Sequence, residues 1–257
     1  MAGCFVVTGG ARGVGRAVAE RLLRDGGAVV VVDADERAMS WARGHPAAAR
    51  IQTLAGDAGD DAVAARVAGM AEDAGGLAGW VNNAAVFRDA ALDAVPAGET
   101  LSLIGANLRP SVAGCRAAIG RFLASGTQGA IVNVSSHQAQ RPVRGALPYA
   151  TAKAAVEGLT RSLAIEYGRH GIRVNAVALG TIVTERCQAL LVGQEPAEAA
   201  RTEAAIAAVH PLGRPGQAEE AAAAIAFLLS GDASFVNGAV LPVDGGRSAL
   251  GQDPEQT

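Results

Sequence analysis

The chain has 257 residues, which is long enough for one large core and short for two domains. Half of the residues are apolar and the formal net charge is −3, with no basic stripe and no apolar run long enough to span a membrane. These features argue against nucleic-acid and membrane partners. The N-terminus enters a strand-like run almost at once, from which we expect no signal peptide. The three cysteines, Cys4, Cys115 and Cys187, lack metal-ligand spacing, so we expect a cytoplasmic protein with free thiols and no metal.

Unbroken apolar runs of strand length recur along the chain. They are Cys4–Thr8, Ala28–Val32, Ile51–Ala55, Gly79–Val81, Ala130–Ser135, Arg173–Ala178 and Ala239–Val243. Segments of helical period lie between them, at Val14–Arg24, Asp61–Ala74, Leu101–Ala124, Ala150–Gly168 and Glu219–Leu229. This alternation predicts a single α/β domain over residues 1–257, a doubly wound (Rossmann-type) parallel sheet of about seven strands with helices on both faces.

Residues 184–216 interrupt this alternation. The segment is long, helical and richer in charge than its surroundings. Because an open sheet binds its ligand beyond the carboxyl ends of its strands, we expect this insertion to be a substrate lid. The polar residues 247–257 are expected to form a flexible tail.

A glycine-rich turn, Thr8–Gly15, joins the first expected strand to the first expected helix. Gly9 and Gly13 let the backbone turn sharply, and the helix that starts near Val14 offers free N–H groups to an anion. Such a turn can be purely structural, but between a first strand and a first helix it predicts a dinucleotide diphosphate site. Ala84, which follows the fourth expected strand, is also counted among the expected cofactor-binding residues.

Two carboxylates follow the next strands. Asp33 ends the second strand, where it can accept both ribose hydroxyls and repel a 2′-phosphate, which favours NAD, unless it only caps the helix that follows. Arg12 leaves NADP possible, since it can face that phosphate or stack on adenine. Asp57 and Ala58 follow the third strand and are expected at the adenine edge, unless Asp57 only forms an Asx-turn.

Asn82 and Asn83 follow the fourth strand. Paired asparagines can be turn formers, but at this position they can also brace the sheet and the adenosine ribose. We therefore count Asn83 among the expected cofactor-binding residues.

Ser136, Tyr149 and Lys153 form the expected catalytic set. Tyr149 and Lys153 are four residues apart, so they share a helix face. A free phenol has a pKa of about 10, and a nearby ammonium lowers it toward the neutral range in which proton transfer works best. Lys153 is the only lysine of the chain. This indicates a role that arginine cannot fill, because arginine does not release its proton, although a single lysine can also survive by chance. Lys153 can also bond the cofactor ribose, and both Tyr149 and Lys153 are counted among the expected cofactor-binding residues.

Together these residues resemble the short-chain dehydrogenase/reductase family from Thr8 to Gly246. The motifs are TGGARGVG at Thr8, NNA at Asn82, IVNVSS at Ile131, YATAK at Tyr149 and RVNAV at Arg173. The thirteen residues from Ser136 to Tyr149 match the family spacing and select Ser136 over Ser135.

The resemblance implies further roles. Asn107 is expected as a fourth catalytic residue that anchors a water on the proton path, although it can also bond only its own backbone. Ile182 and Thr184 are expected at the nicotinamide carboxamide, and the family commonly forms a homotetramer through its two long helices. Two departures stand out. Ala85 replaces a usual glycine, and Leu179 replaces a usual proline, which is expected to free the loop beside the nicotinamide.

His137 and Leu179 are expected to touch a small-molecule substrate, with loop packing as the alternative for His137. The sequence thus predicts an oxidoreductase that transfers a hydride between NAD and a secondary alcohol or ketone, with Tyr149 as acid/base. The alternatives are an NADPH-dependent 3-oxoacyl reductase and, from another class, a cofactor-binding sensor without turnover.

Overall fold

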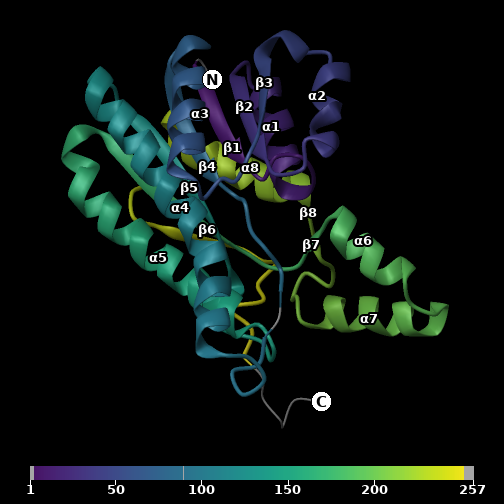
Figure 1. Ribbon diagram of the computed structural model, residues 1–257. Helices are drawn as coiled ribbons and strands as arrows, with labels where there is room; N and C mark the ends of the chain where they lie inside the picture. Colours follow the sequence, from purple (N-terminus) through teal and green to yellow (C-terminus); the bar gives the residue numbers. More distant parts are fainter. Residues whose placement is uncertain (1–2, 89, 252–257) are drawn as a thin grey trace.

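A seven-stranded parallel sheet forms the centre of the computed structural model, which describes residues 3–88 and 90–251 (Figure 1). Its strands are β1 (Cys4–Thr8), β2 (Ala28–Asp33), β3 (Ile51–Ala55), β4 (Leu77–Asn82), β5 (Gly129–Ser136), β6 (Ile172–Leu179) and β9 (Val240–Val243). They lie in the order β3-β2-β1-β4-β5-β6-β9, and every neighbouring pair is parallel. The predicted fold class is confirmed.

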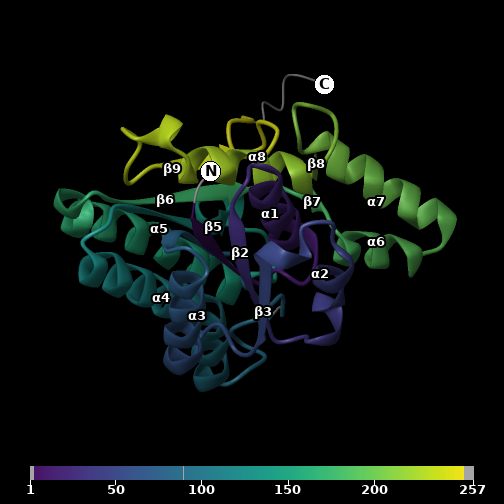
Figure 2. The same ribbon diagram turned by 90° about the horizontal axis from the view of Figure 1, so that it is seen from above.

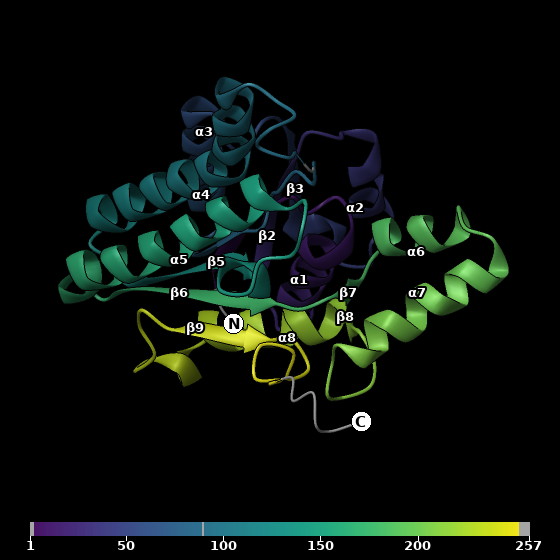
Figure 3. The same ribbon diagram turned by 90° about the horizontal axis from the view of Figure 1, so that it is seen from below.

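Helices cover both faces of this sheet (Figures 2 and 3). One face carries α1 (Gly13–Arg24) and α8 (Ala218–Leu229), and the other carries α3 (Asp61–Asp73), α4 (Ala97–Ser125) and α5 (Leu147–Tyr167). The strand β2 shows why its sequence is apolar without interruption. Val29 and Val31 pack into the core beside α1, whereas Val30 and Val32 pack into the core beside α3.

Two helices begin earlier than the apolar periodicity predicts. The helix expected from Leu101 begins at Ala97, directly after Pro96, and the helix expected from Ala150 begins at Leu147. Proline lacks a backbone N–H but is tolerated in the first helical turn, where that N–H has no partner in the helix. Apolar spacing alone therefore does not predict these early helix starts.

The segment expected as a lid contains two helices and a small strand pair. After β7 (Ile182–Val183) come α6 (Glu185–Val192) and α7 (Pro196–Ala208), and β8 (Gly216–Gln217) returns beside β7. In Figure 1 both helices project away from the sheet. The parallel pairing of Ile182 with Gly216 joins the entry and the exit of this segment, a contact that the sequence did not predict.

Part of the expected tail forms hydrogen-bonded turns directly after β9. The backbone N–H of Arg247 donates to the carbonyl of Asp244 at 3.1 Å, and that of Leu250 donates to Gly246 at 3.1 Å. The remainder of the predicted tail, residues 252–257, lies outside the described residues. Within the described part of the chain, no helix combines the length and the apolar character needed to cross a membrane.

The chain direction across the sheet reverses between β1 and β4. The first three strands build outward from β1, and the chain then crosses back to β4 and builds in the other direction. In open parallel sheets this reversal leaves a crevice at the carboxyl ends of the central strands, where ligands bind. The predicted site residues follow these strand ends.

Candidate active site

A cavity of about 1110 Å³ lies at the carboxyl ends of the central strands. Most of the residues predicted to bind cofactor or substrate line it, namely Gly9, Arg12, Gly13, Val14, Asp33, Asn83, Ala84, Ser136, His137, Tyr149, Lys153, Leu179, Ile182 and Thr184. Asp57, Ala58 and Asn107 are not among the lining residues. The cavity therefore unites the expected glycine turn and the expected catalytic set in one continuous space.

The glycine turn has the backbone that a diphosphate requires. Gly9 and Gly13 adopt positive φ angles of 66° and 55°, which residues with a Cβ rarely take. A Cβ on Gly15 would lie 2.1 Å from the carbonyl oxygen of Gly9. Because α1 begins at Gly13, the turn aims the helix N-terminus into the cavity, and these residues fit the diphosphate of a dinucleotide.

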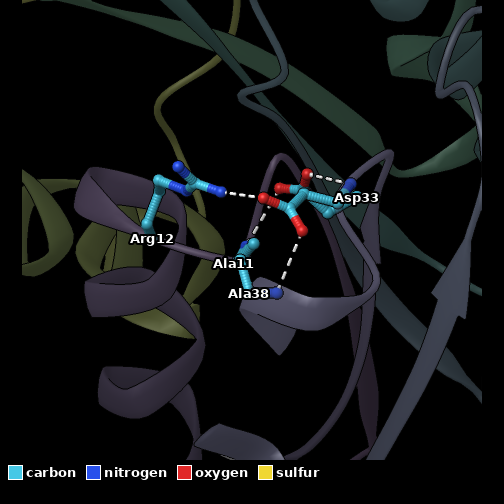
Figure 4. Close-up of polar contacts among 5 residues, drawn as sticks. Ala11, Arg12, Asp33 and Ala38 are labelled. Atoms are coloured by element: carbon cyan, nitrogen blue, oxygen red, sulfur yellow. Dashed lines mark hydrogen bonds and ion pairs between the residues drawn. The ribbon is translucent and has the colours of Figure 1, made fainter. Parts of the chain in front are cut away.

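Two acidic residues, Asp33 and Asp35, lie at the carboxyl end of β2, and Figure 4 shows the polar contacts there, with Asp33 labelled. Asp33 accepts hydrogen bonds from the backbone N–H of Ala11 at 3.1 Å and of Asp35 at 3.0 Å. Asp35 forms an ion pair with Arg12. The backbone N–H of Ala38 and the guanidinium of Arg12 lower the pKa of the Asp35 carboxyl. Arg12 is thus held by a carboxylate that the sequence analysis did not single out, although D-A-D at the strand end was a visible signal.

The paired asparagines after β4 brace the sheet. The Asn83 side chain donates to the carbonyl oxygens of Thr8 at 3.1 Å and Gly9 at 3.0 Å, which fixes the start of the glycine turn. Asn82 is buried and donates to the Asn133 side chain at 2.8 Å. The bracing role is observed in these contacts, while contact of Asn83 with ribose remains a prediction.

Ser135 and Ser136 point to different partners at the end of β5. Ser135 Oγ donates to the buried Glu157 carboxylate at 3.1 Å and is thereby turned toward α5. Both serines line the cavity, but Ser136 Oγ accepts from the backbone N–H of Gln138 at 3.2 Å. The hydroxyl hydrogen of Ser136 is not used in that bond, so it can be donated to a substrate oxygen.

Tyr149 and Lys153 lie one turn apart on α5. The Lys153 ammonium nitrogen is 5.4 Å from the centroid of the Tyr149 ring, and it donates to the carbonyl oxygen of Val134 at 2.7 Å. The Lys153 side chain is 2% exposed, and burial lowers its pKa from 10.5 to about 8. The Phe87 ring packs 5.1 Å from the Tyr149 ring, a contact that no sequence motif indicated.

Asn107 and Asp57 make local hydrogen bonds. Asn107 Oδ1 accepts from the backbone N–H of Val86 at 2.9 Å, and its Nδ2 donates to Leu103 O at 3.2 Å. Asp57 accepts from the N–H of Gly59 at 2.8 Å, which is the Asx-turn geometry considered above. The roles predicted for Asn107, Asp57 and Ala58 toward water or adenine stay predictions.

His137 is buried beside Ser136. Its Nδ1 donates to the carbonyl oxygen of Leu179 at 3.2 Å, and burial and nearby Arg247 lower its pKa, which favours the neutral ring. Its Nε2 has no hydrogen-bond partner among the described residues.

The loop that follows Leu179 is held rather than free. Gly180 N–H donates to Val243 O at 3.1 Å, and Thr181 N–H donates to His210. The loss of proline at Leu179 is therefore offset by hydrogen bonds that the sequence did not reveal. No group of three His, Cys, Asp or Glu side chains in the described residues is arranged to hold a metal ion.

Comparison with known proteins agrees with this geometry. A family model described as enoyl-(acyl carrier protein) reductase matches residues 9–248. Levodione reductase of Leifsonia aquatica is 35% identical over 95% of this chain and 93% of its own. Cis-4-hydroxycyclohexanecarboxylate dehydrogenase of Sinomonas cyclohexanicum is 41% identical over 95% of this chain and 96% of its own. The crystal structure of a levodione reductase superposes with a TM-score of 0.88, covering 96% of this chain and 98% of that chain, at 33% identity.

The fold and the cavity define a dinucleotide-binding oxidoreductase with a tyrosine–lysine pair. The chain belongs to the short-chain dehydrogenase/reductase family, as its sequence motifs predicted. It is therefore an enzyme that uses a nicotinamide cofactor to interconvert alcohol and carbonyl groups.

Proposed function

We propose that the enzyme interconverts a secondary alcohol and a ketone with NAD, and that Tyr149 transfers the proton. The observation that carries this proposal is the buried Lys153 ammonium 5.4 Å from the Tyr149 ring, in a cavity that Ser136 also lines. The proximity of a cation favours the ionised phenol, which is the form that can accept a proton from an alcohol.

Ser136, Tyr149, Lys153 and Asn107 each have a separate proposed role in moving the proton. The nicotinamide ring, when bound, accepts or supplies the hydride. In the oxidation direction, Ser136 orients the substrate hydroxyl and Tyr149 takes its proton. Lys153 favours the ionised phenol, and its pKa of about 8 allows it to pass a proton onward near neutral pH. Asn107 is proposed to connect this path to solvent. In the reduction direction, Tyr149 donates the proton to the carbonyl oxygen.

NAD is the proposed cofactor because of the charges at the end of β2. Asp33 lines the cavity and is proposed to accept the ribose hydroxyls, and Arg12, the cation that could bind a 2′-phosphate, is paired with Asp35. Other residues would hold the rest of the cofactor. We assign the diphosphate to Gly9, Gly13 and Val14, the adenosine to Asp57, Ala58, Asn83 and Ala84, and the nicotinamide to Leu179, Ile182 and Thr184.

The proposed substrate is a small alicyclic secondary alcohol or its ketone. Two relatives that match nearly the whole chain are named for levodione and for cis-4-hydroxycyclohexanecarboxylate. His137 and Leu179 line the cavity beside the catalytic set, and residues 184–216 are proposed to form a lid over it.

The test is turnover of a panel of secondary alcohols and ketones with each cofactor. The panel includes levodione and cis-4-hydroxycyclohexanecarboxylate, and the change in nicotinamide absorbance is the readout. We expect turnover with NAD or NADH at a kcat/KM about tenfold or more above that with the phosphorylated cofactor, which corresponds to about 1.4 kcal/mol. A preference for NADPH with 3-oxoacyl substrates would overturn this assignment. Binding of NADH without any turnover would favour a sensor.

The proposed assembly is a homotetramer in the cytosol. Leu101 on α4 and Ile165 on α5 are exposed apolar side chains on the two long helices that such an interface would use. Cys4, Cys115 and Cys187 are free thiols, which suits a reducing compartment. Light scattering coupled to size exclusion tests the assembly, and a monomeric mass would contradict it.

A further inference from the structure

His210 lies just beyond the end of α7 and is buried, with only 2% of its surface exposed. Its Nδ1 is 2.6 Å from the carbonyl oxygen of Ile206, and its Nε2 is 3.2 Å from the backbone nitrogen of Thr181. A carbonyl oxygen only accepts and a backbone N–H only donates, so Nδ1 carries the hydrogen and Nε2 accepts. The neutral ring in this one tautomer satisfies both contacts.

Thr181 is the residue on which several segments meet. It lines the cavity between Leu179 and Ile182. Its Oγ1 accepts from the Arg247 guanidinium at 3.0 Å, and its carbonyl oxygen accepts from Gly216 N–H at 2.9 Å. Together with the bond to His210, these contacts engage the backbone N–H, the backbone carbonyl and the side chain of Thr181.

The packing around His210 leaves little room for another ring position. A Cβ on Gly180 would lie 3.1 Å from His210 Nε2 and 2.8 Å from the Cα of Asp244. Gly245 also lies against His210, since a Cβ on it would be 3.6 Å from both the Cβ and the Cδ2 of His210. The ring is thus enclosed between the loop after β6 and the turn after β9.

We propose that His210 is a positioning residue for the cavity floor, by which we mean the lining residues from Leu179 to Ile182. Through its Nε2 it fixes the backbone of Thr181 beside the expected nicotinamide, and through Nδ1 it ties the end of α7 to the same point. The movable part of the lid is then the α6–α7 segment before His210. This inference rests on the proposed function in taking the floor at Thr181 as the nicotinamide side of the cavity.

Two variants separate the bond to Thr181 from simple packing. In His210→Gln the side-chain oxygen reaches the place of Nε2 and can accept from Thr181, whereas in His210→Asn the side-chain nitrogen reaches only the place of Nδ1 and can donate to Ile206. Both variants remain polar and similar in size. Only the glutamine variant is expected to keep the hydrogen bond from the Thr181 amide.

The first readout is hydrogen exchange at the Thr181 amide in the full-length enzyme without cofactor. We expect exchange about tenfold or more faster in His210→Asn, because the amide loses its acceptor, and close to wild type in His210→Gln. The second readout is the dissociation constant of NADH, which is expected to rise about tenfold in the asparagine variant alone. In the same variant, turnover of the panel substrates should show a larger change in KM than in kcat.

Exchange and NADH binding that match wild type in both variants would overturn the positioning role. Equal losses in both variants would overturn it too, because they would indicate packing only. If the exchange pattern follows the prediction while wild type turns over no panel compound, the positioning role holds and the proposed function fails.

Discussion

Lys153 allows the electrostatics of the site to be measured on a single group. It is the only lysine of the chain, so protein labelled with ¹³C-lysine gives one side-chain signal to follow with pH. Burial lowers its pKa from 10.5 to about 8, which corresponds to about 3 kcal/mol against the ammonium in the folded enzyme. We expect the signal to titrate with a midpoint of about 8 in the folded enzyme and about 10.4 in urea.

The same shift predicts how stability depends on pH. Below pH 8 the lysine holds its proton in both states, and the fold bears the full cost of burying it. Between about pH 8 and pH 10.5 only the unfolded chain keeps the proton, so the free energy of unfolding rises with pH. With Tyr149→Phe in both proteins, so that the phenol adds no pH dependence of its own, the enzyme that keeps Lys153 should gain about 3 kcal/mol over Lys153→Met across that window at the same protein concentration.

Urea unfolding followed by tryptophan fluorescence measures this difference. The variant also loses the bond to Val134 O, but that contribution adds a nearly constant offset and not a slope with pH. A folded-state midpoint at or above the urea value, or a stability difference that does not change with pH, would refute the reasoning.

Three further predictions test other parts of the site. In Gly15→Ala the added methyl would lie 2.1 Å from a backbone oxygen of the glycine turn, so NADH binding measured by fluorescence should weaken by about 100-fold or more. Binding like wild type would contradict the assignment of the glycine turn to the diphosphate. Asp35→Asn releases Arg12 and should lower the NADPH dissociation constant about tenfold relative to that of NADH, an effect that Arg12→Ala should remove; an unchanged ratio would contradict the pairing. Ser136→Ala should lower kcat by about 100-fold or more, whereas Ser135→Ala should keep kcat within about tenfold and lower the melting temperature, and equal losses of kcat would oppose the assignment.

The sheet and the catalytic spacing could be predicted because they depend on local sequence. Strands covered on both faces need uninterrupted apolar runs, and β2 shows such a run. Tyr149 and Lys153 share a face because they lie four residues apart on one helix, and the cavity indeed contains both.

The residues that sequence reasoning missed are defined by tertiary contacts. Asp35 was missed because its ion pair with Arg12 reaches across the glycine turn. His210 was missed because the Thr181 amide that it accepts from lies 29 positions earlier in the chain. Phe87 packs on Tyr149 from a loop without a motif. None of these pairings follows a helical or strand period, so only the folded chain reveals them.

The most direct test of the account is Tyr149→Phe, which removes one hydroxyl and keeps the ring beside Phe87. NADH affinity and melting temperature should stay close to wild type, because the ring packing survives. Turnover of the best panel substrate should fall by about 100-fold to 10,000-fold, the usual contribution of a positioned acid/base. A variant that binds NADH and retains turnover within about tenfold of wild type would contradict the role of Tyr149.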